Sequence, residues 1–433
     1  MIRPGLERIT RLLAHLPTPN YPTVHVAGTN GKGSICAYLT TLLLNHSQSS
    51  PTTSPFKRIG RFTSPHLVYP GDNITINNDP LPSSSYNRLS THIAAINVRE
   101  NIGASEFEQL TATAFTAFVE EHVDIGIIEC GMGGRLDATN VLVNPVVTVI
   151  ARLGFDHQAF LGTTAEAIAM EKAGIMREGV PCVVDSGSEK AFLNEVLRQG
   201  EMKGAPVTLT PSPETASEDF ESLFRDIPAE TLARDVPATA QQNMWTAYLA
   251  YKHLLSSFSL PSPTPTSISQ TIAKILQAPT PTPGRFHSLS LTFLFPHRQT
   301  PIFLDGAHNT QAFSLLVHHL AHQRRTPDER ITWLLACTSS RDPDELVELI
   351  PEGDSVVATT FGGVEGMPWV RPCGVERWTD VLEGLRRAGM WNVDPDVMAA
   401  LGRAVEVAGD GPLVVAGSLY LVGDVLRLVD GRK

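Results

Sequence analysis

The feature that most constrains the fold is a glycine-rich loop between an apolar strand-like run and a helix-like run. Residues 23–27 read Thr-Val-His-Val-Ala, residues 28–34 read Gly-Thr-Asn-Gly-Lys-Gly-Ser, and residues 35–44 are mostly apolar. Glycines at such a turn let backbone N–H groups and the helix N-terminus face anionic oxygens. Lys32 adds a positive charge and Ser34 a hydroxyl suited to Mg²⁺. The segment therefore predicts a phosphate-binding loop, because a turn without a ligand does not need these residues in this order.

Strand-like apolar runs alternate with helix-like segments along the chain, which favours parallel sheets with helices on both faces. The strand candidates are 23–27, 125–129 and 146–150 in the first half, and 302–304, 331–336, 356–360 and 413–416 in the second. A Ser-, Thr- and Pro-rich segment at 278–283 separates the two sets, and 433 residues exceed what one hydrophobic core usually serves. We therefore predict an α/β fold with two domains, at 1–283 and 284–433.

Composition argues against several classes of protein. The net charge is -11 and no Lys- and Arg-rich stripe is present, which disfavours binding to a phosphate backbone. No apolar run approaches the roughly 20 residues that span a bilayer. Five widely spaced cysteines, with no C-x-x-C pair, suggest neither a disulfide framework nor a structural zinc site. We expect a soluble, cytoplasmic protein with no nucleic-acid and no membrane partner; a mitochondrial location stays open, although Glu7 comes early for a transit peptide.

Titratable residues follow the other strand candidates of the first half. Glu129 ends an apolar run before a glycine-rich turn, and a carboxylate beside a phosphate loop is well placed to hold Mg²⁺. A structural ion pair with a nearby base such as Arg135 is the alternative for Glu129 alone. His157 and Lys172 come after the run at 146–150. Taken singly, they would be interpreted as a structural histidine and a solvated surface lysine.

Together these segments resemble the folylpolyglutamate synthase and dihydrofolate synthase family of the Mur ligase superfamily. The loop departs from the general phosphate-loop pattern at Val26 and Gly33, and in this form it is similar to the Mur ligases. Further matching segments are 62–67, 106–108 with Thr111, 283–285 and 304–309, so the resemblance covers nearly the whole chain. Segments 72–78, 363–369 and 417–423 are similar to the fungal dihydrofolate synthases of this family.

The resemblance implies a P-loop ATPase domain with a mainly parallel sheet, followed by a smaller Rossmann-like glutamate-ligase domain. It implies a monomeric ligase that uses ATP and one or two Mg²⁺ ions to join L-glutamate to 7,8-dihydropteroate through an acyl phosphate. The products would be 7,8-dihydrofolate, ADP and phosphate. A folylpolyglutamate synthase or bifunctional enzyme acting on reduced folates is the alternative within the family. An ATP-hydrolysing switch or binding module is the alternative from another class.

The resemblance also implies roles for individual residues. ATP is expected to contact Gly31, Lys32, Gly33, Ser34, Asn243, Arg285 and Asp305, and magnesium to contact Ser64, Glu129 and His157. Dihydropteroate is expected near Phe107, Glu108, Leu136, Asp137 and Ala138, and the catalytic set is Lys32, Lys172, His157, Asp305 and His308.

Three of these expectations carry further detail. Lys172 is expected to be carbamylated, which would turn a cation into an anionic oxygen donor. His308 is expected to orient or deprotonate the glutamate amine, with a structural contact to its glycine turn as the alternative. At 239–240, shortly before Asn243, Thr-Ala stands where the family often has His-Gln or Tyr-Gln.

Overall fold

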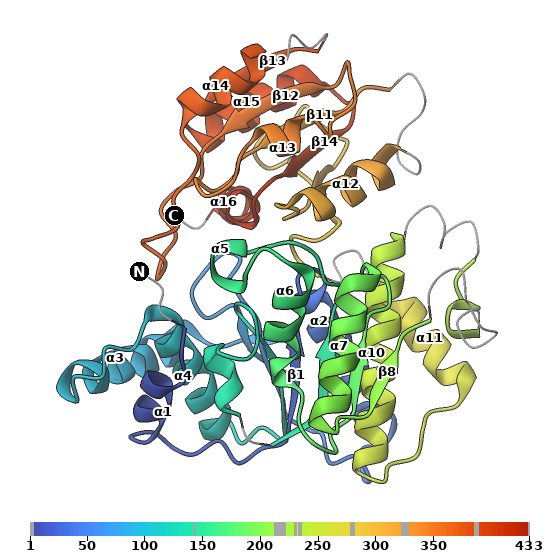
Figure 1. Ribbon diagram of the computed structural model, residues 1–433. Coiled ribbons are helices and arrows are strands. Elements are labelled where there is room, and N and C mark those ends of the chain that lie inside the picture. The colour runs from blue at the N-terminus through green and yellow to red at the C-terminus, as the bar shows by residue number, and fades with distance from the viewer. Residues whose placement is uncertain are drawn as a thin grey trace. The chain divides into compact units, whose positions relative to one another are not determined.

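The computed structural model describes residues 4–142, 144–211, 222–228, 232, 236–277, 282–321, 329–384 and 389–431. The chain divides into two compact α/β units, shown in Figure 1 in colours from blue to yellow and from orange to red. Unit 1 comprises Met1–His66 and Pro70–Gln277, and unit 2 comprises Leu67–Tyr69 and Ala278–Lys433. The predicted fold class is confirmed. The predicted boundary after residue 283 stays a prediction, and residues 278–281 lie outside the described part.

Unit 1 is built on an eight-stranded sheet in the order β4-β3-β2-β5-β1-β6-β7-β8. The strands are β1 Thr23–Ala27, β2 Ile59–Phe62, β3 Ile74–Ile76, β4 Asp79–Pro80, β5 Ile125–Glu129, β6 Pro145–Ile150, β7 Cys182–Val184 and β8 Val207–Leu209. Pairing is parallel from β2 through β5, β1, β6 and β7 to β8, whereas the edge pairs β2–β3 and β3–β4 are antiparallel, so β3 runs opposite to the other strands. All residues of β1 and β5 are buried, as expected for central strands covered on both faces.

The helices of unit 1 cover both faces of this sheet. They are α1 Glu7–Leu13, α2 Lys32–Ser49, α3 Ser83–Arg99, α4 Glu106–Glu120, α5 Gln158–Leu161, α6 Ala165–Lys172, α7 Lys190–Lys203, α10 Ala238–Ser257 and α11 Pro265–Leu276, with short 3-10 turns η1 Ala138–Val141 and η2 Ala173–Ile175. Val24 and Val26 face α2, α10 and α11 in one apolar core. Successive side chains of a strand point to opposite faces, so His25 and Ala27 face the side covered by α4, α6 and α7.

Unit 2 has a six-stranded sheet in the order β13-β12-β11-β14-β10-β9, parallel except for β9. The strands are β9 His287–Leu289, β10 Ile302–Leu304, β11 Thr332–Leu335, β12 Ser355–Thr359, β13 Trp391–Asp394 and β14 Leu413–Ala416. The helices are α12 Thr310–His319, α13 Asp344–Val347, α14 Val375–Gly384, α15 Val397–Ala408 and α16 Leu419–Asp430. One apolar core contains Trp333 and Trp378, and the core on the other face contains Leu401 and Val425. Among the described residues, no helix is both long enough and apolar enough to cross a membrane.

Candidate active site

The phosphate loop has the predicted strand–loop–helix geometry. It leaves β1 at Ala27 and enters α2 at Lys32. The N–H groups of Thr29 and Asn30 donate to the carbonyl of Arg152 at 2.9 and 3.1 Å, which anchors the loop to the end of β6. The first N–H groups of a helix have no partner within the helix, so the start of α2 offers donors to an anion. The local structure therefore fits phosphate binding.

Asn243 of α10 lies directly against this loop. Gly31 has φ 88, and a Cβ added there would lie 2.3 Å from Asn243 Oδ1. Both the left-handed backbone and the close approach require glycine. The structure thus brings together Gly31 and Asn243, although the residues that precede Asn243 differ from the family pattern.

A second part of the site is a buried carboxylate beside the loop lysine. Glu129 ends β5 and is 4% exposed. Lys32 Nζ lies 3.7 Å from Glu129 Oε1 and donates to the carbonyl of Thr29 at 3.2 Å, while the N–H of Ser64 donates to Glu129 Oε2 at 3.4 Å. The base that pairs with Glu129 is thus Lys32 of the loop, whereas Arg135 Nη2 pairs with Glu171 Oε1 at 2.6 Å.

The predicted magnesium ligands Ser64, Glu129 and His157 include one carboxylate, that of Glu129. Among the described residues, no group of three or more His, Cys, Asp or Glu side chains is arranged to hold a metal. Magnesium is usually bound through one or two carboxylates, with water and substrate phosphates completing its shell. One buried carboxylate, Glu129, close to Ser64 and to the phosphate loop, fits that mode. His157 is exposed and follows β6, on the opposite side of β1 from β5.

Lys172 is not the solvated lysine that its helical position suggests. It ends α6, is 2% exposed, and its Nζ donates to the carbonyl of Gly28 at 2.7 Å. Burial, together with the charge of Lys32, lowers the pKa of Lys172 to about 7, against the opposing effect of Asp156. A substantial fraction of neutral amine therefore exists near neutral pH. Neutral amine is the form that can react as a nucleophile.

The residues expected near the pterin gather around the turn that follows β5. Phe107 of α4 is half-buried and stacks on Phe62, with ring centroids 6.3 Å apart. A Cβ added at Gly131 would lie 2.4 Å from Phe107 Cζ, so the ring covers this turn. Leu136 is half-buried and Ala138 is buried in the same turn.

Two carboxylates of this region, those of Glu108 and Asp137, accept hydrogen bonds that stabilise the start of α4 and of η1. Glu108 forms a capping box with Ser105 at the start of α4 and pairs with Arg8 Nε at 3.0 Å. Asp137 caps η1: its Oδ1 accepts from the N–H of Thr139 at 3.0 Å, and its Oδ2 accepts from the N–H of Met132 at 2.8 Å. Burial raises the pKa of Asp137, and these hydrogen bonds oppose that shift.

In unit 2, Asp305 joins the end of β10 to the turn that carries Arg285. Its Oδ2 accepts from the N–H of Phe286 at 2.9 Å, its Oδ1 accepts from the N–H of Ala307 at 2.8 Å, and Arg285 Nη1 lies 3.8 Å from Oδ1. Burial raises the pKa of Asp305, and the charge of Arg285 opposes the shift. His308 Nδ1 lies 2.8 Å from the carbonyl of Gly306, which only accepts, so Nδ1 carries a proton.

Sequence reasoning missed two polar residues around the loop. Arg152 supplies the carbonyl that anchors it, and a main-chain contact of this kind leaves no signal in the residue type. His25 is buried in β1, two residues before Ala27. The signal for His25 was present, because a histidine inside an otherwise apolar central strand needs a buried hydrogen-bond partner.

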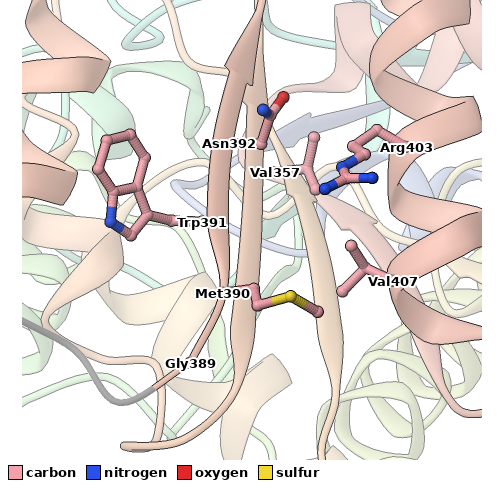
Figure 2. A pocket seen from close by; sticks show the side chains of 7 residues that line it. All are labelled: Val357, Gly389, Met390, Trp391, Asn392, Arg403 and Val407. Atoms are coloured by element: carbon pink, nitrogen blue, oxygen red, sulfur yellow. The ribbon is translucent and has the colours of Figure 1, made fainter.

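A pocket in unit 2 contains none of the predicted site residues. It is lined by Val357, Gly389, Met390, Trp391, Asn392, Arg403 and Val407. Figure 2 shows the indole of Trp391 on the opposite side of its strand from Arg403 and Val407. Arg403 also pairs with Glu406 at 3.0 Å. We therefore assign no function to this pocket.

The chain is similar to known proteins along its whole length. A profile described as "Dihydrofolate synthetase, C-terminal domain" matches residues 290–428. The probable dihydrofolate synthetase of Schizosaccharomyces pombe is 36% identical over 434 residues, which cover 98% of each protein. The dihydrofolate synthetase of Saccharomyces cerevisiae is 34% identical over 435 residues, which cover 98% of this chain and 97% of the yeast protein.

The fold is similar to those of solved bacterial enzymes. A folylpolyglutamate synthase of Mycobacterium tuberculosis, complexed with ADP and AMPPCP, has a TM-score of 0.78 at 26% identity and matches 100% of this chain and 96% of that one. A bifunctional folylpolyglutamate synthase/dihydrofolate synthase of Yersinia pestis, complexed with AMPPNP and Mn ion, has a TM-score of 0.74 at 26% identity and matches 99% and 94%. Together with the full-length fungal relatives, these matches confirm the predicted resemblance: the chain belongs to the family of dihydrofolate synthetases and folylpolyglutamate synthases.

Proposed function

We propose that this protein is a dihydrofolate synthetase, a ligase that uses ATP to join L-glutamate to 7,8-dihydropteroate. The full-length similarity to two fungal dihydrofolate synthetases supports this substrate pair. The observation that carries the proposal is the placement of Lys32, Glu129 and Lys172 around one phosphate loop: Lys32 donates to the carbonyl of Thr29, Glu129 pairs with Lys32, and Lys172 donates to the carbonyl of Gly28. Such a site suits the transfer of a phosphoryl group to a carboxylate.

The reaction proceeds in two steps. A carboxylate oxygen of dihydropteroate attacks the γ-phosphorus of ATP, the bond to the bridging oxygen breaks, and ADP leaves an acyl phosphate behind. Lys32 stabilises the negative charge on the transferred phosphoryl oxygens, together with the N–H donors at the start of α2. When bound, Mg²⁺ neutralises charge on the nucleotide phosphates, and Ser64, Glu129 and His157 are the residues proposed to hold it. Nucleotide contacts from Asn243, Arg285 and Asp305 complete this part of the proposal.

In the second step the neutral amine of L-glutamate attacks the acyl carbonyl, inorganic phosphate leaves, and the new amide gives up the amine proton. Because His308 Nδ1 is protonated, Nε2 is its basic nitrogen, and we propose it as the proton acceptor. Asp305 holds the turn from residue 284 to 286 in place. Its proposed role is therefore to position Arg285.

Lys172 is proposed to carry a carbamate. Its neutral amine would attack dissolved CO₂, forming an N–C bond and losing one proton, to give an anionic oxygen donor near Lys32. Burial and the pKa of about 7 support this, because the reaction needs the unprotonated amine. A buried ammonium with no such modification would instead sit unfavourably beside a second cation.

For the acceptor, the proposed contacts are the half-buried Phe107 and Leu136, with Ala138 lining the turn behind them. Glu108 and Asp137 are proposed to act mainly by holding this surface in shape, since their carboxylates already accept hydrogen bonds from the protein. An aromatic ring beside a glycine turn suits a flat heterocycle.

The test is ADP formation with ATP and Mg²⁺, comparing dihydropteroate with tetrahydrofolate as acceptor, each with and without L-glutamate. Turnover that needs both dihydropteroate and glutamate is the expected result. Turnover with tetrahydrofolate would instead make the protein a folylpolyglutamate synthase or a bifunctional enzyme. Hydrolysis that ignores glutamate would indicate a nucleotide-dependent switch and overturn the ligase proposal.

A further inference from the structure

His25 is a polar residue in the centre of a buried sheet. It is 1% exposed and lies in β1, between β5 and β6. Its Nε2 lies 2.8 Å from Thr139 Oγ1 and 3.1 Å from Cys130 Sγ. Burial, together with the charge of Arg177, lowers the pKa of His25 to about 3, so the imidazole is neutral at physiological pH.

The hydrogen bond from Thr139 to Asp137 fixes the direction of this chain of contacts. Thr139 Oγ1 donates to Asp137 Oδ1 at 2.6 Å, and that oxygen also accepts from the N–H of Thr139. Both Asp137 oxygens accept from backbone N–H groups, so the carboxyl group acts here as an acceptor and the single hydroxyl proton of Thr139 is directed at it. Thr139 Oγ1 therefore accepts from His25 Nε2–H.

The surroundings of the other ring nitrogen, Nδ1, are consistent with donation from His25 Nε2–H to Thr139. In the described part of the chain, His25 Nδ1 is buried and makes no hydrogen bond. A neutral imidazole with its proton on Nε2 leaves Nδ1 as a lone pair. A buried acceptor without a partner is tolerated more often than a buried N–H.

This network connects two parts of the site. His25 precedes the phosphate loop by three residues, whereas Asp137 holds the turn after β5 through the N–H of Met132. Phe107 covers the same turn at Gly131. The loop itself is anchored independently, because Thr29 and Asn30 donate to the carbonyl of Arg152. Loss of the network should therefore disturb the turn and leave the phosphate loop in place.

We propose that His25 and Thr139 are positioning residues for the turn at 136–138 and so determine affinity for the pterin acceptor. The inference rests on the proposed function, which places the acceptor at this turn. His25 Nε2–H orients the Thr139 hydroxyl, and the hydroxyl fixes the carboxylate of Asp137, which holds the turn. Neither residue is assigned a contact with substrate.

The test compares substitutions that keep or remove one hydrogen bond without changing the shape of the core. Thr139→Val removes the hydroxyl and Thr139→Ser keeps it. His25→Gln places an amide N–H near the position of Nε2, whereas the shorter His25→Asn places it near Nδ1, where it does not reach Thr139. Thr23→Val is the matched control, because Thr23 lies on the same strand and face, and in the described chain its buried Oγ1 makes no hydrogen bond.

The readouts are KM for dihydropteroate, KM for ATP and the melting temperature. Thr139→Val, which removes a hydrogen bond to a carboxylate, should raise the KM for dihydropteroate about tenfold. His25→Asn, which removes a hydrogen bond between neutral groups, should raise it about fivefold, and both variants should leave the KM for ATP within about twofold. Thr139→Ser, His25→Gln and Thr23→Val should keep both KM values close to those of the unchanged protein. If Thr139→Val does not fold, the His25→Gln and His25→Asn pair still decides the matter.

An equal rise in both KM values, or no rise in either, would overturn the inference. The same holds if His25→Gln and His25→Asn behave alike. The unchanged protein separates this outcome from failure of the proposed function. If it turns over tetrahydrofolate and not dihydropteroate, the proposed substrate is wrong, and the KM ratios are then measured with tetrahydrofolate.

Discussion

At the residue scale, burial decides what Lys172 can do. We predict that Lys172→Ala lowers kcat by a factor on the order of 100 or more, because the site loses a charged group close to the phosphate loop. A small added carboxylate should partly restore activity by replacing the carbamate oxygen. The measurement is kcat with and without added carboxylate. Full activity of Lys172→Ala without rescue would rule out a catalytic carbamate on Lys172.

The control for this substitution is Lys203→Ala. Lys203 Nζ also donates to a backbone carbonyl, that of Ala173 at 3.1 Å, and its pKa is also lowered by burial. It lies at the end of α7, and we assign it no part in the reaction, so kcat should be retained. After exposure to ¹³C-labelled CO₂, a carbamate carbon signal should be present in Lys203→Ala and absent in Lys172→Ala.

The pKa of Lys172 also predicts how stability depends on pH. The folded-state pKa of about 7 lies below the ordinary lysine value of 10.5, so between these values the unfolded chain binds more protons than the folded one. Stability must then rise with pH across this window, by at most about 1.4 kcal/mol per pH unit from this residue. In CO₂-free buffer, the free energy of unfolding of the unchanged protein minus that of Lys172→Met should increase from about pH 7 to about pH 9. A difference that stays flat would show that Lys172 keeps an ordinary pKa.

At the element scale, the phosphate loop and the central strands could be predicted because their signals are local. β1 and the start of α2 lie next to each other in the sequence, and β5 and β6 are long apolar runs. β7 and β8 were missed. β8 lies at the edge of the sheet and is only partly buried, so its segment lacks the continuous apolar run that marks β5 and β6.

The network that holds the turn at 136–138 was also missed. The contact of His25 with Thr139 joins residues 114 positions apart, and nothing in the local pattern of either segment encodes it. The Asp137 cap of η1 is local and carries a recognisable Asx signal. The sequence therefore drew attention to the turn at 136–138, but not to His25 and Thr139, whose hydrogen bonds hold it in place.

The junction of β1 with α2 gives a prediction about backbone geometry. We expect Gly31→Ala to raise the KM for ATP at least about tenfold, because the new Cβ is strained at φ 88 and also collides with Asn243. Gly103→Ala is the matched control. Gly103 has φ 71 with no atom within 4 Å of the added Cβ, so it tests backbone strain alone.

Both variants should lose stability through the left-handed backbone, by about 1–2 kcal/mol. Only Gly31→Ala should affect ATP. Combining it with Asn243→Ala should recover part of its melting temperature by removing the collision. If Gly103→Ala raises the KM for ATP as much as Gly31→Ala, the loop contact has no special role.

At the scale of the whole molecule, the chain passes from one unit to the other three times, after His66, after Tyr69 and after Gln277. The length of the chain predicted two domains, yet no sequence signal assigns Leu67–Tyr69 to the second one. Leu67 packs against an apolar core of unit 2, and its carbonyl lies so close to Gly423 that a Cβ there would be 2.0 Å away. Gly423 therefore allows α16 to hold this crossing segment.

This contact predicts an exception to the usual effect of replacing a helical glycine. In a helix interior, Gly→Ala normally stabilises by about 1 kcal/mol. Gly402→Ala in α15 should follow that rule, since the nearest atom to its Cβ is Phe295 Cε1 at 3.7 Å. Gly423→Ala in α16 should instead destabilise by about 1–3 kcal/mol, because a backbone carbonyl must move. Thermal unfolding of the two variants measures the difference in sign.

Gly423→Ala should also change the Mg²⁺ concentration that activity requires. Leu67 follows Ser64 by three residues, and the N–H of Ser64 donates to Glu129. Displacing Leu67 should disturb Ser64, so Gly423→Ala should need more Mg²⁺ for half-maximal ADP formation, whereas Gly402→Ala should not. An unchanged Mg²⁺ requirement in a destabilised Gly423→Ala protein would show that the crossing segment absorbs the shift before Ser64. In that case unit 2 supports the fold at this point without setting the geometry at Glu129.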